Sequence, residues 1–282
     1  VREDAARLYA WCRFADDVID GQEHGYGAAV VERPDAQLAD LRARTDAALN
    51  GETTGDPIFD GFGEVASRRG ITRCLAHDLL DGFQMDVTAR HYETVDDLYE
   101  YCYGVAGAVG VMMGLTIGVA ADDTDTLDRA CDLGLAFQMT NIARDSLADA
   151  RVGRVYLPAT WLADEGLPSR AQAVTDPANA AAVHRVVSRL VSEAEAYYAS
   201  ATVGVRRLPF RVAWAIASAG SVYRAIGARR VTWGASRIAD RARTTTAEKL
   251  GLIAGASVTA ARRSERGLPL DRDGLWQRPP RP

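Results

Sequence analysis

The sequence QMTNIARDSLADARVGRVYLP, residues 138–158, combines a helical stripe of polar residues with an apolar background. Gln138, Asn141, Asp145 and Asp149 follow one another at spacings of three, four and four residues, so in an α-helix all four lie on one face. The neighbouring Ile142 is apolar, which indicates a partly buried helix. Amides and carboxylates on such a face are costly unless something binds them, and Mg²⁺ is a natural partner because it prefers oxygen ligands. A solvated polar face is the alternative, and it would be favoured if this stripe stood alone.

A second acidic cluster lies at residues 9–20, which read YAWCRFADDVID. Asp16, Asp17 and Asp20 form a DDxxD pattern, and Arg13 and Tyr9 precede them on the same helical stripe. The flanking residues are apolar or aromatic, which indicates that this helix is largely buried. A salt-bridged surface helix is the alternative interpretation.

Two inward-facing acidic clusters on two helices would repel each other in a core of low dielectric constant. The arrangement is favourable if divalent cations lie between the clusters. Mg²⁺ held by carboxylates and bound to a diphosphate stabilises that leaving group, which lowers the barrier to C–O ionisation. Arg13 and Arg144 would add contacts to the diphosphate. Together the two clusters predict a site that ionises a diphosphate ester.

Helical signals dominate the rest of the chain, and no alternating β-branched runs joined by a hairpin turn occur. Apolar spacing, capping patterns such as the capping box with Thr94 as N-cap and Asp97 in place of Glu, and Pro or Gly breaks predict a single all-α domain of about ten helices. The expected helices cover residues 4–20, 35–49, 57–69, 72–88, 94–119, 124–149, 159–165, 176–201, 208–230 and 244–264. No linker divides residues 1–282, and residues 265–282 form a Pro-rich C-terminal tail.

Composition argues against several classes of function. The net charge of −5 gives no support for nucleic-acid binding. The four cysteines form no CxxC pair and the four histidines no HExxH motif, so reduced cytoplasmic thiols are expected rather than a zinc site or disulfides. No signal peptide is visible. The uncharged run at residues 105–121 fits a buried core helix better than a membrane span, and its small residues would leave room beside it for an apolar cavity.

These motifs resemble the squalene/phytoene synthase family, the head-to-head prenyl transferases. Residues 9–20 resemble the family's first Asp-rich motif, YCYGVAGAVG at 101–110 resembles its first signature, and residues 138–158 resemble its second. The resemblance spans essentially the whole chain. Within the family, the segments YAWCR, GRVYLP, TTTAEKL and LWQRP are most similar to bacterial phytoene synthases. The resemblance implies an all-α bundle of the isoprenoid synthase type with a central active-site cavity.

The resemblance also implies a reaction, the condensation of two geranylgeranyl diphosphates. One substrate ionises, its allyl cation adds to the double bond of the other, and proton loss closes the cyclopropane of prephytoene diphosphate. A second ionisation, rearrangement and proton loss give phytoene, the first committed product of carotenoid biosynthesis, and two diphosphates are released. The implied cofactor is Mg²⁺, with Mn²⁺ as a substitute, and NADPH is not needed because no net reduction occurs.

The resemblance assigns roles to residues that match the family motifs. The implied metal ligands are Asp16, Asp17, Asp20, Asp145 and Asp149. The implied substrate-binding residues are Gln138 and Asn141 beside the metal ions, and Arg13, Arg144 and Arg241 at the diphosphates. Tyr9, Tyr101 and Tyr223, together with Arg13, make up the implied catalytic set, in which the tyrosines steady carbocations or help proton transfer.

Two departures from the family pattern bear on activity. The second motif reads DSLAD, with Ser146 where the family usually has an aliphatic residue and Ala148 where it often has an acidic one. Both ligand positions are kept, so metal binding is expected. The chain opens at Val1 inside the first predicted helix, without the preceding segment that in the family helps to cover the diphosphates. Loss of that segment would lower activity.

Two other functions fit the same motifs. A squalene- or dehydrosqualene-type synthase would use farnesyl diphosphate, because the choice of chain length depends on cavity depth rather than on motif spacing. An inactive family member would act as a scaffold for other carotenoid enzymes at the membrane. Since substrate and product are lipophilic, a cytoplasmic location with peripheral contact to the inner face of the cell membrane is expected. The oligomeric state is left open.

Overall fold

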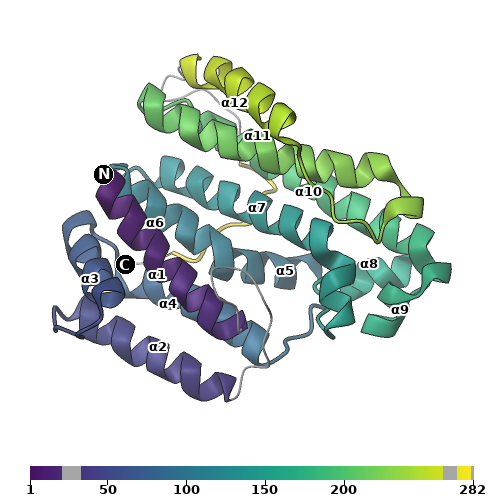
Figure 1. The fold of residues 1–282 in the computed structure, drawn as a ribbon, viewed down its shortest axis with the longest axis horizontal. Helices are drawn as coiled ribbons and strands as arrows, with labels where there is room; N and C mark the ends of the chain where they lie inside the picture. Colours follow the sequence, from purple (N-terminus) through teal and green to yellow (C-terminus); the bar gives the residue numbers. More distant parts are fainter. Residues whose placement is uncertain (21–32, 263–271, 281–282) are drawn as a thin grey trace. The chain divides into compact units, whose positions relative to one another are not determined.

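The computed structural model describes residues 1–20, 33–262 and 272–280, and over these ranges it is helical with no strand (Figure 1). The all-α prediction is therefore confirmed. The α-helices are α1 (Arg2–Asp20), α2 (Pro34–Leu49), α3 (Pro57–Arg69), α4 (Arg73–Val87), α5 (Val95–Cys102), α6 (Ala108–Thr116), α7 (Thr124–Arg151), α8 (Ala159–Asp164), α9 (Ala171–Thr175), α10 (Ala180–Val205), α11 (Phe210–Trp233) and α12 (Thr246–Ala261). A π-helical turn η1 (Tyr103–Gly107) and the 3₁₀ turns η2 (Pro177–Asn179) and η3 (Ala235–Arg237) complete the described elements.

The predicted helices are found with small differences. The helix expected over residues 94–119 is α5, η1 and α6 in succession, and α6 ends at Thr116. Its predicted capping box is confirmed: the Asp97 backbone N–H donates to Thr94 Oγ1 at 3.3 Å, and the Thr94 N–H donates to the Asp97 carboxylate at 2.8 Å. The short helix α9 was not predicted, because five residues are too few to show a helical period.

The described residues pack into two compact units. The first comprises Val1–Arg90, Tyr103–Cys131 and Arg278–Pro282, and the second comprises His91–Cys102 and Asp132–Gln277. Helix α7 begins in the first unit and continues in the second. The expectation of one domain over residues 1–282 stays a prediction.

Helix α1 packs within the first unit through one apolar face. The buried residues of that face are Leu8, Trp11, Ala15 and Ile19. The ring of Trp11 stacks on Phe62 of α3 with centroids 3.9 Å apart, and its Nε1–H donates to Thr45 Oγ1 of α2 at 3.3 Å. These contacts fix the rotation of α1 about its axis, so its polar stripe faces away from the first unit's core.

The first turn of α1 is held by a buried ion pair. Arg68 and Arg69 of α3 donate to the Asp4 carboxylate at 2.6 and 2.8 Å. The hydrogen bond from Arg69, supported by the nearby positive charges, holds the pKa of Asp4 below its ordinary value although burial opposes this. Asp4 is therefore ionised at neutral pH and ties α1 to α3.

The uncharged run at residues 105–121 is a core element, as predicted, and no helix of the described residues is long and apolar enough to cross a bilayer. Glycines within this run and just before it, however, serve close helix packing. A Cβ at Gly104 would lie 2.7 Å from the Gly82 Cα, and a Cβ at Gly110 would lie 2.3 Å from the Ala130 carbonyl oxygen. Only glycine permits such approaches. The prediction that small residues leave room for a cavity was wrong at these two positions.

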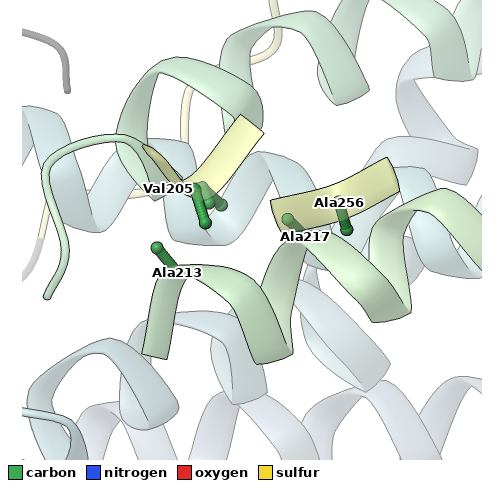
Figure 2. Packing of buried hydrophobic residues seen from close by; sticks show 5 residues of the cluster. Val205, Ala213, Ala217 and Ala256 are labelled. Carbon is green, nitrogen blue, oxygen red and sulfur yellow. The ribbon is translucent and has the colours of Figure 1, made fainter. Parts of the chain in front are cut away.

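The second unit contains a helical hairpin in which α11 and α12 run side by side in opposite directions (Figure 1). Its interface is built from small buried residues: Val205 of α10, Ala213 and Ala217 of α11, and Ala256 and Ala260 of α12 (Figure 2). Because these side chains are short, the two backbones lie close together. The opposite face of α12 stays in solvent.

The described part of the predicted C-terminal tail is anchored rather than free. Arg272 donates to both oxygens of the fully buried Asp132 at 2.8 Å, and Ser200 Oγ donates to the same carboxylate at 2.5 Å. The Trp276 N–H donates to the Tyr197 hydroxyl at 3.1 Å. The tail therefore contributes buried polar contacts to the second unit.

Candidate active site

Helix α7 presents one half-buried face in an otherwise buried stretch. Between residues 131 and 147 the half-buried positions are Leu133, Phe137, Gln138, Asn141, Arg144 and Asp145, and Asp149 continues the set. At 100° per residue these positions fall within an arc of about 160°. The predicted polar stripe is thus one face of α7, and Phe137 and Leu133 extend that face with apolar side chains.

The two amides of the stripe contact each other. Asn141 Nδ2 donates to Gln138 Oε1 at 3.4 Å. The Asn141 Oδ1 atom is buried and has no hydrogen-bond partner among the described residues. A buried acceptor without a partner is costly, and an amide oxygen beside carboxylates is a suitable ligand for a hard cation. The Asn141 amide oxygen is therefore one free donor of the kind that a divalent metal ion binds.

Asp145 is the centre of a charged cluster in the second unit. Arg144 Nε donates to Asp145 Oδ1 at 3.0 Å, and Arg241 Nε donates to the same oxygen at 2.8 Å. Both guanidinium groups also reach Oδ2, at 2.5 and 3.1 Å. The structure thus brings Arg241 to Asp145 across 96 residues of sequence.

The charges of this cluster reinforce one another. Burial raises the pKa of Asp145, but the hydrogen bonds and positive charges of Arg144 and then Arg241 outweigh it, so the pKa lies below its ordinary value. For Arg144, burial lowers the pKa, while the bond to Asp145 outweighs that effect and raises it. Asp145 and Arg144 are therefore both charged at neutral pH.

A buried arginine holds the segment that carries Arg241. Arg230 of α11 is 1% exposed and donates to main-chain carbonyls rather than to a carboxylate. Its Nε reaches Ala143 of α7 at 3.1 Å, and its terminal nitrogens reach Ile238 at 2.5 Å and Asp240 at 3.0 Å. Burial lowers the pKa of Arg230, although the nearby negative charges of Asp145 and Asp240 act to raise it. Arg230 thus links the 238–240 backbone to α7 at Ala143, the residue immediately before Arg144 and Asp145.

Aromatic rings line the apolar part of the α7 face. Tyr223 of α11 stacks on Phe137 with centroids 4.4 Å apart, and the ring centroid of Tyr198 of α10 lies 6.2 Å from that of Phe137. The Tyr198 hydroxyl and Thr140 Oγ1 are 2.9 Å apart and share a hydrogen bond. The faces of such rings carry partial negative charge and attract cations. The predicted residue Tyr223 is therefore placed beside the half-buried face of α7.

Tyr101 lies in a separate aromatic group of the second unit. Its buried ring stacks on Tyr156 at 4.9 Å and contacts Tyr92 at 5.4 Å. Tyr156 belongs to the GRVYLP segment, which is fixed where the Ala159 N–H donates to the Tyr92 carbonyl at 2.9 Å. The structure thus joins the family's first signature to the end of its second.

A cavity of about 100 Å³ continues the apolar part of the α7 face. It is lined by residues of α7, α10, α11 and α12, namely Leu133, Tyr198, Ala201, Thr202, Val205, Ile216, Ala217, Gly220, Ser221, Arg224 and Thr259. Leu133 and Asp145 are twelve residues apart, which corresponds to about 18 Å along the helix axis. The charged cluster and Leu133 therefore lie at opposite ends of one face, and the cavity at Leu133 mixes apolar side chains with hydroxyl groups and Arg224.

The acidic cluster of α1 belongs to the first unit. Arg13 donates to Asp16 at 2.8 Å and to Asp17 at 2.6 Å, so the predicted stripe is an ion-paired group. Tyr9 is 62% exposed, unlike its buried neighbour Trp11, so the expected burial of this helix holds for only one of its faces. Asp20 ends α1, and its side chain lies outside the described residues.

Within either unit, the described acidic, histidine and cysteine side chains form no group of three that could hold a metal ion. The two predicted ligand clusters lie in different units. Their joint role as one metal site stays a prediction. The carboxylates of each cluster, with the amide oxygen of Asn141, provide the oxygen donors that such an ion prefers.

Three residues of this region were not predicted from the sequence. Phe137 could have been found because it immediately precedes Gln138 on an amphipathic helix, and Tyr156 because it lies inside a family motif. The burial of Arg230 could not be predicted from the sequence, because an arginine near a helix end is usually solvated. Its partners are backbone carbonyls, which no side-chain motif in the sequence reveals.

A family model described as squalene/phytoene synthase matches residues 1–232. The chain belongs to the squalene/phytoene synthase family. Among its relatives in this family, a 15-cis-phytoene synthase of a Paracoccus species is 48% identical over 279 residues, which cover 99% of this chain and 90% of the relative. The 15-cis-phytoene synthase of Pantoea ananas is 48% identical over 280 residues, which cover 99% of this chain and 89% of the relative.

Solved structures of the squalene/phytoene synthase type share the fold. A dehydrosqualene synthase in complex with a ligand superimposes with a TM-score of 0.72 at 24% identity, over 90% of this chain and 85% of the other. A squalene synthase from Alicyclobacillus acidocaldarius gives a TM-score of 0.65 at 24% identity, over 80% of each chain. The predicted family and the isoprenoid synthase fold are confirmed.

Proposed function

We propose that this family member is a phytoene synthase that joins two molecules of geranylgeranyl diphosphate head to head. The reaction converts two C20 diphosphates into one C40 hydrocarbon, two diphosphates and two protons, by way of prephytoene diphosphate. The relatives named above support this substrate class. The observation that carries the proposal is the change along one face of α7 from the charged cluster at Asp145 to the stacked rings of Phe137 and Tyr223.

The charged end of that face suits a diphosphate. Arg144 and Arg241 are planar, permanently charged groups that bind phosphate oxygens in pairs. Asp145 holds both guanidinium groups in position before substrate arrives, which reduces the entropy lost on binding. We assign Arg13, paired with Asp16 and Asp17 on α1, the same role toward diphosphate.

The carboxylates of Asp16, Asp17, Asp20, Asp145 and Asp149 are proposed to hold Mg²⁺, with Gln138 and Asn141 in support. When bound, the metal ion would supply Lewis-acid stabilisation of the diphosphate leaving group. Mn²⁺ shares the preference for oxygen ligands and is expected to substitute. No NADPH is needed because the product is not reduced.

The aromatic end of the face suits the reactive hydrocarbon. Phe137 and Tyr223 would lie beside the allylic carbons, where their ring faces favour developing positive charge. The cavity beyond them, at Leu133, would take part of a prenyl chain and exclude water, which would otherwise capture the carbocation. We assign Tyr9 and Tyr101 to steadying cations or assisting proton transfer.

Product analysis with each substrate tests the proposal. The purified chain is incubated with Mg²⁺ and either geranylgeranyl or farnesyl diphosphate in detergent, and the hydrocarbons are identified by mass spectrometry. We expect phytoene from the C20 substrate, and no product when the metal is chelated. A C30 product from farnesyl diphosphate alone would indicate a squalene- or dehydrosqualene-type synthase instead. The absence of any Mg²⁺-dependent diphosphate release would favour an inactive scaffold.

The variant Asp145→Asn tests the assignment of the site. It keeps the size of the side chain but removes the charge that holds Arg144 and Arg241. We expect diphosphate release to be lost while the circular dichroism spectrum is unchanged. Full release by this variant would show that Asp145 is not part of the site.

A lipophilic substrate and product also favour peripheral contact with a membrane. We propose that the chain works on the cytoplasmic side of the cell membrane and binds its surface without crossing it. Binding of the purified chain to lipid vesicles tests this part separately from the enzymatic reaction.

A further inference from the structure

The hairpin of α11 and α12 exposes an apolar surface, here called the α11–α12 face and formed by Phe210, Trp214, Leu250, Ala254 and Val258. Leu250 and Val258 are 63% and 54% exposed, and both aromatic rings are exposed as well. No charged residue occurs between Arg211 and Arg224 on α11 or between Lys249 and Arg262 on α12. Uncharged helix faces of this extent are unusual on a protein surface and indicate a contact surface.

The end of this face is positively charged. Arg206, Arg207 and Arg211 lie at the turn from α10 to α11, and Arg262 follows the last turn of α12. Those two places adjoin, since Val205 and Leu208 pack with Ala260. Neither Arg211 nor Arg262 forms an ion pair with a carboxylate of the described residues. Residues 196–239 contain seven arginines and no acidic residue, although the whole chain carries a net charge of −5.

We propose that the α11–α12 face docks on an anionic lipid surface. An apolar helix face with exposed Trp and Phe and a rim of arginines has the composition of helices that lie in the headgroup region of a bilayer. The arginines would bind anionic headgroups.

The inference rests on the membrane contact proposed above, and vesicle flotation tests both. The full chain is mixed with vesicles of phosphatidylcholine, with or without phosphatidylglycerol. We expect binding to the anionic vesicles, weakening in high salt because exposed charges are screened. The paired variant Leu250→Gln/Val258→Gln is expected to lower vesicle affinity roughly tenfold or more, since two apolar contacts are lost. Arg211→Glu/Arg262→Glu is expected to remove the preference for anionic vesicles.

Matched controls separate the outcomes. Val152→Gln changes an exposed valine outside the face and is expected to bind vesicles like the unaltered chain. Thermal unfolding confirms that each variant is folded, and phytoene formation in detergent is expected to be unchanged in the Leu250/Val258 variant. If the unaltered chain binds no vesicles, membrane contact and this inference both fail.

If the unaltered chain and the Leu250/Val258 variant bind equally, only the assignment of the face is overturned. A change in oligomeric state on light scattering, with vesicle binding unaltered, would instead identify the face as a protein contact and would also overturn the assignment.

Discussion

At the scale of single residues, Ser146 distinguishes this chain from the usual family pattern. Its hydroxyl is buried and has no hydrogen-bond partner among the described residues. We expect Ser146→Ala to stabilise the protein by about 1 kcal/mol, because an unsatisfied buried group is removed and alanine favours the helix. Urea unfolding measures the difference. A loss of stability would show that the hydroxyl makes a contact in solution.

The pair of Asp145 and Arg241 predicts a pH effect. The pKa of Asp145 lies below its ordinary value, so the stabilising ion pairs are fully present above the unfolded-state pKa and are lost as the pH falls through the folded-state pKa. Arg241→Gln removes one of the two positive charges that lower the pKa of Asp145, while burial still raises it. The pKa of Asp145 therefore rises in this variant. We therefore expect the acid limb of the pH profile of kcat/KM to move to higher pH. Arg241→Lys, which keeps the charge, is the control and should shift less. An unmoved limb in Arg241→Gln would contradict the coupling.

At the scale of elements, Arg230 joins α11, α7 and the 238–240 segment. Arg230→Met removes the donors to four carbonyl groups while filling a similar volume. We expect a loss of about 2–4 kcal/mol in the free energy of unfolding, since a buried hydrogen-bonded network is broken.

The same variant should raise KM for the diphosphate substrate more than it lowers kcat, because Arg241 is no longer held at Asp145. Arg230→Lys keeps the charge but lacks the planar fork that reaches several carbonyls, so it should rescue only in part. An unchanged KM in Arg230→Met would confine Arg230 to a structural role.

At the scale of the whole molecule, the proposed function requires the acidic clusters of α1 and α7 to serve one metal-bound diphosphate. Asp17→Asn and Asp145→Asn should then each lower kcat/KM by roughly a hundredfold or more, and the double variant should be little worse than either, because groups that act as a unit are not additive. Asp164→Asn, at an exposed carboxylate paired with Arg189, is the control. Multiplicative losses in the double variant would indicate two independent sites.

The predictions made from sequence were strongest where geometry is local. A helix period fixes which side chains share a face, so the stripe from Gln138 to Asp149 and the capping box at Thr94 were predicted correctly. The same period could not show how Gly104 and Gly110 are used, because that depends on which backbone lies opposite them.

The sequence by itself determined the all-helical class, the two acidic stripes and the family. Helix propensity, residue spacing and motif order act over a few residues, so they can be read without knowing the fold. Only the tertiary structure decided that Arg144 and Arg241 meet on Asp145, that Arg230 is buried on backbone carbonyls, and that a cavity continues the α7 face beyond Phe137. Those features depend on contacts between residues far apart in the chain, and such contacts are set by how helices pack rather than by local sequence.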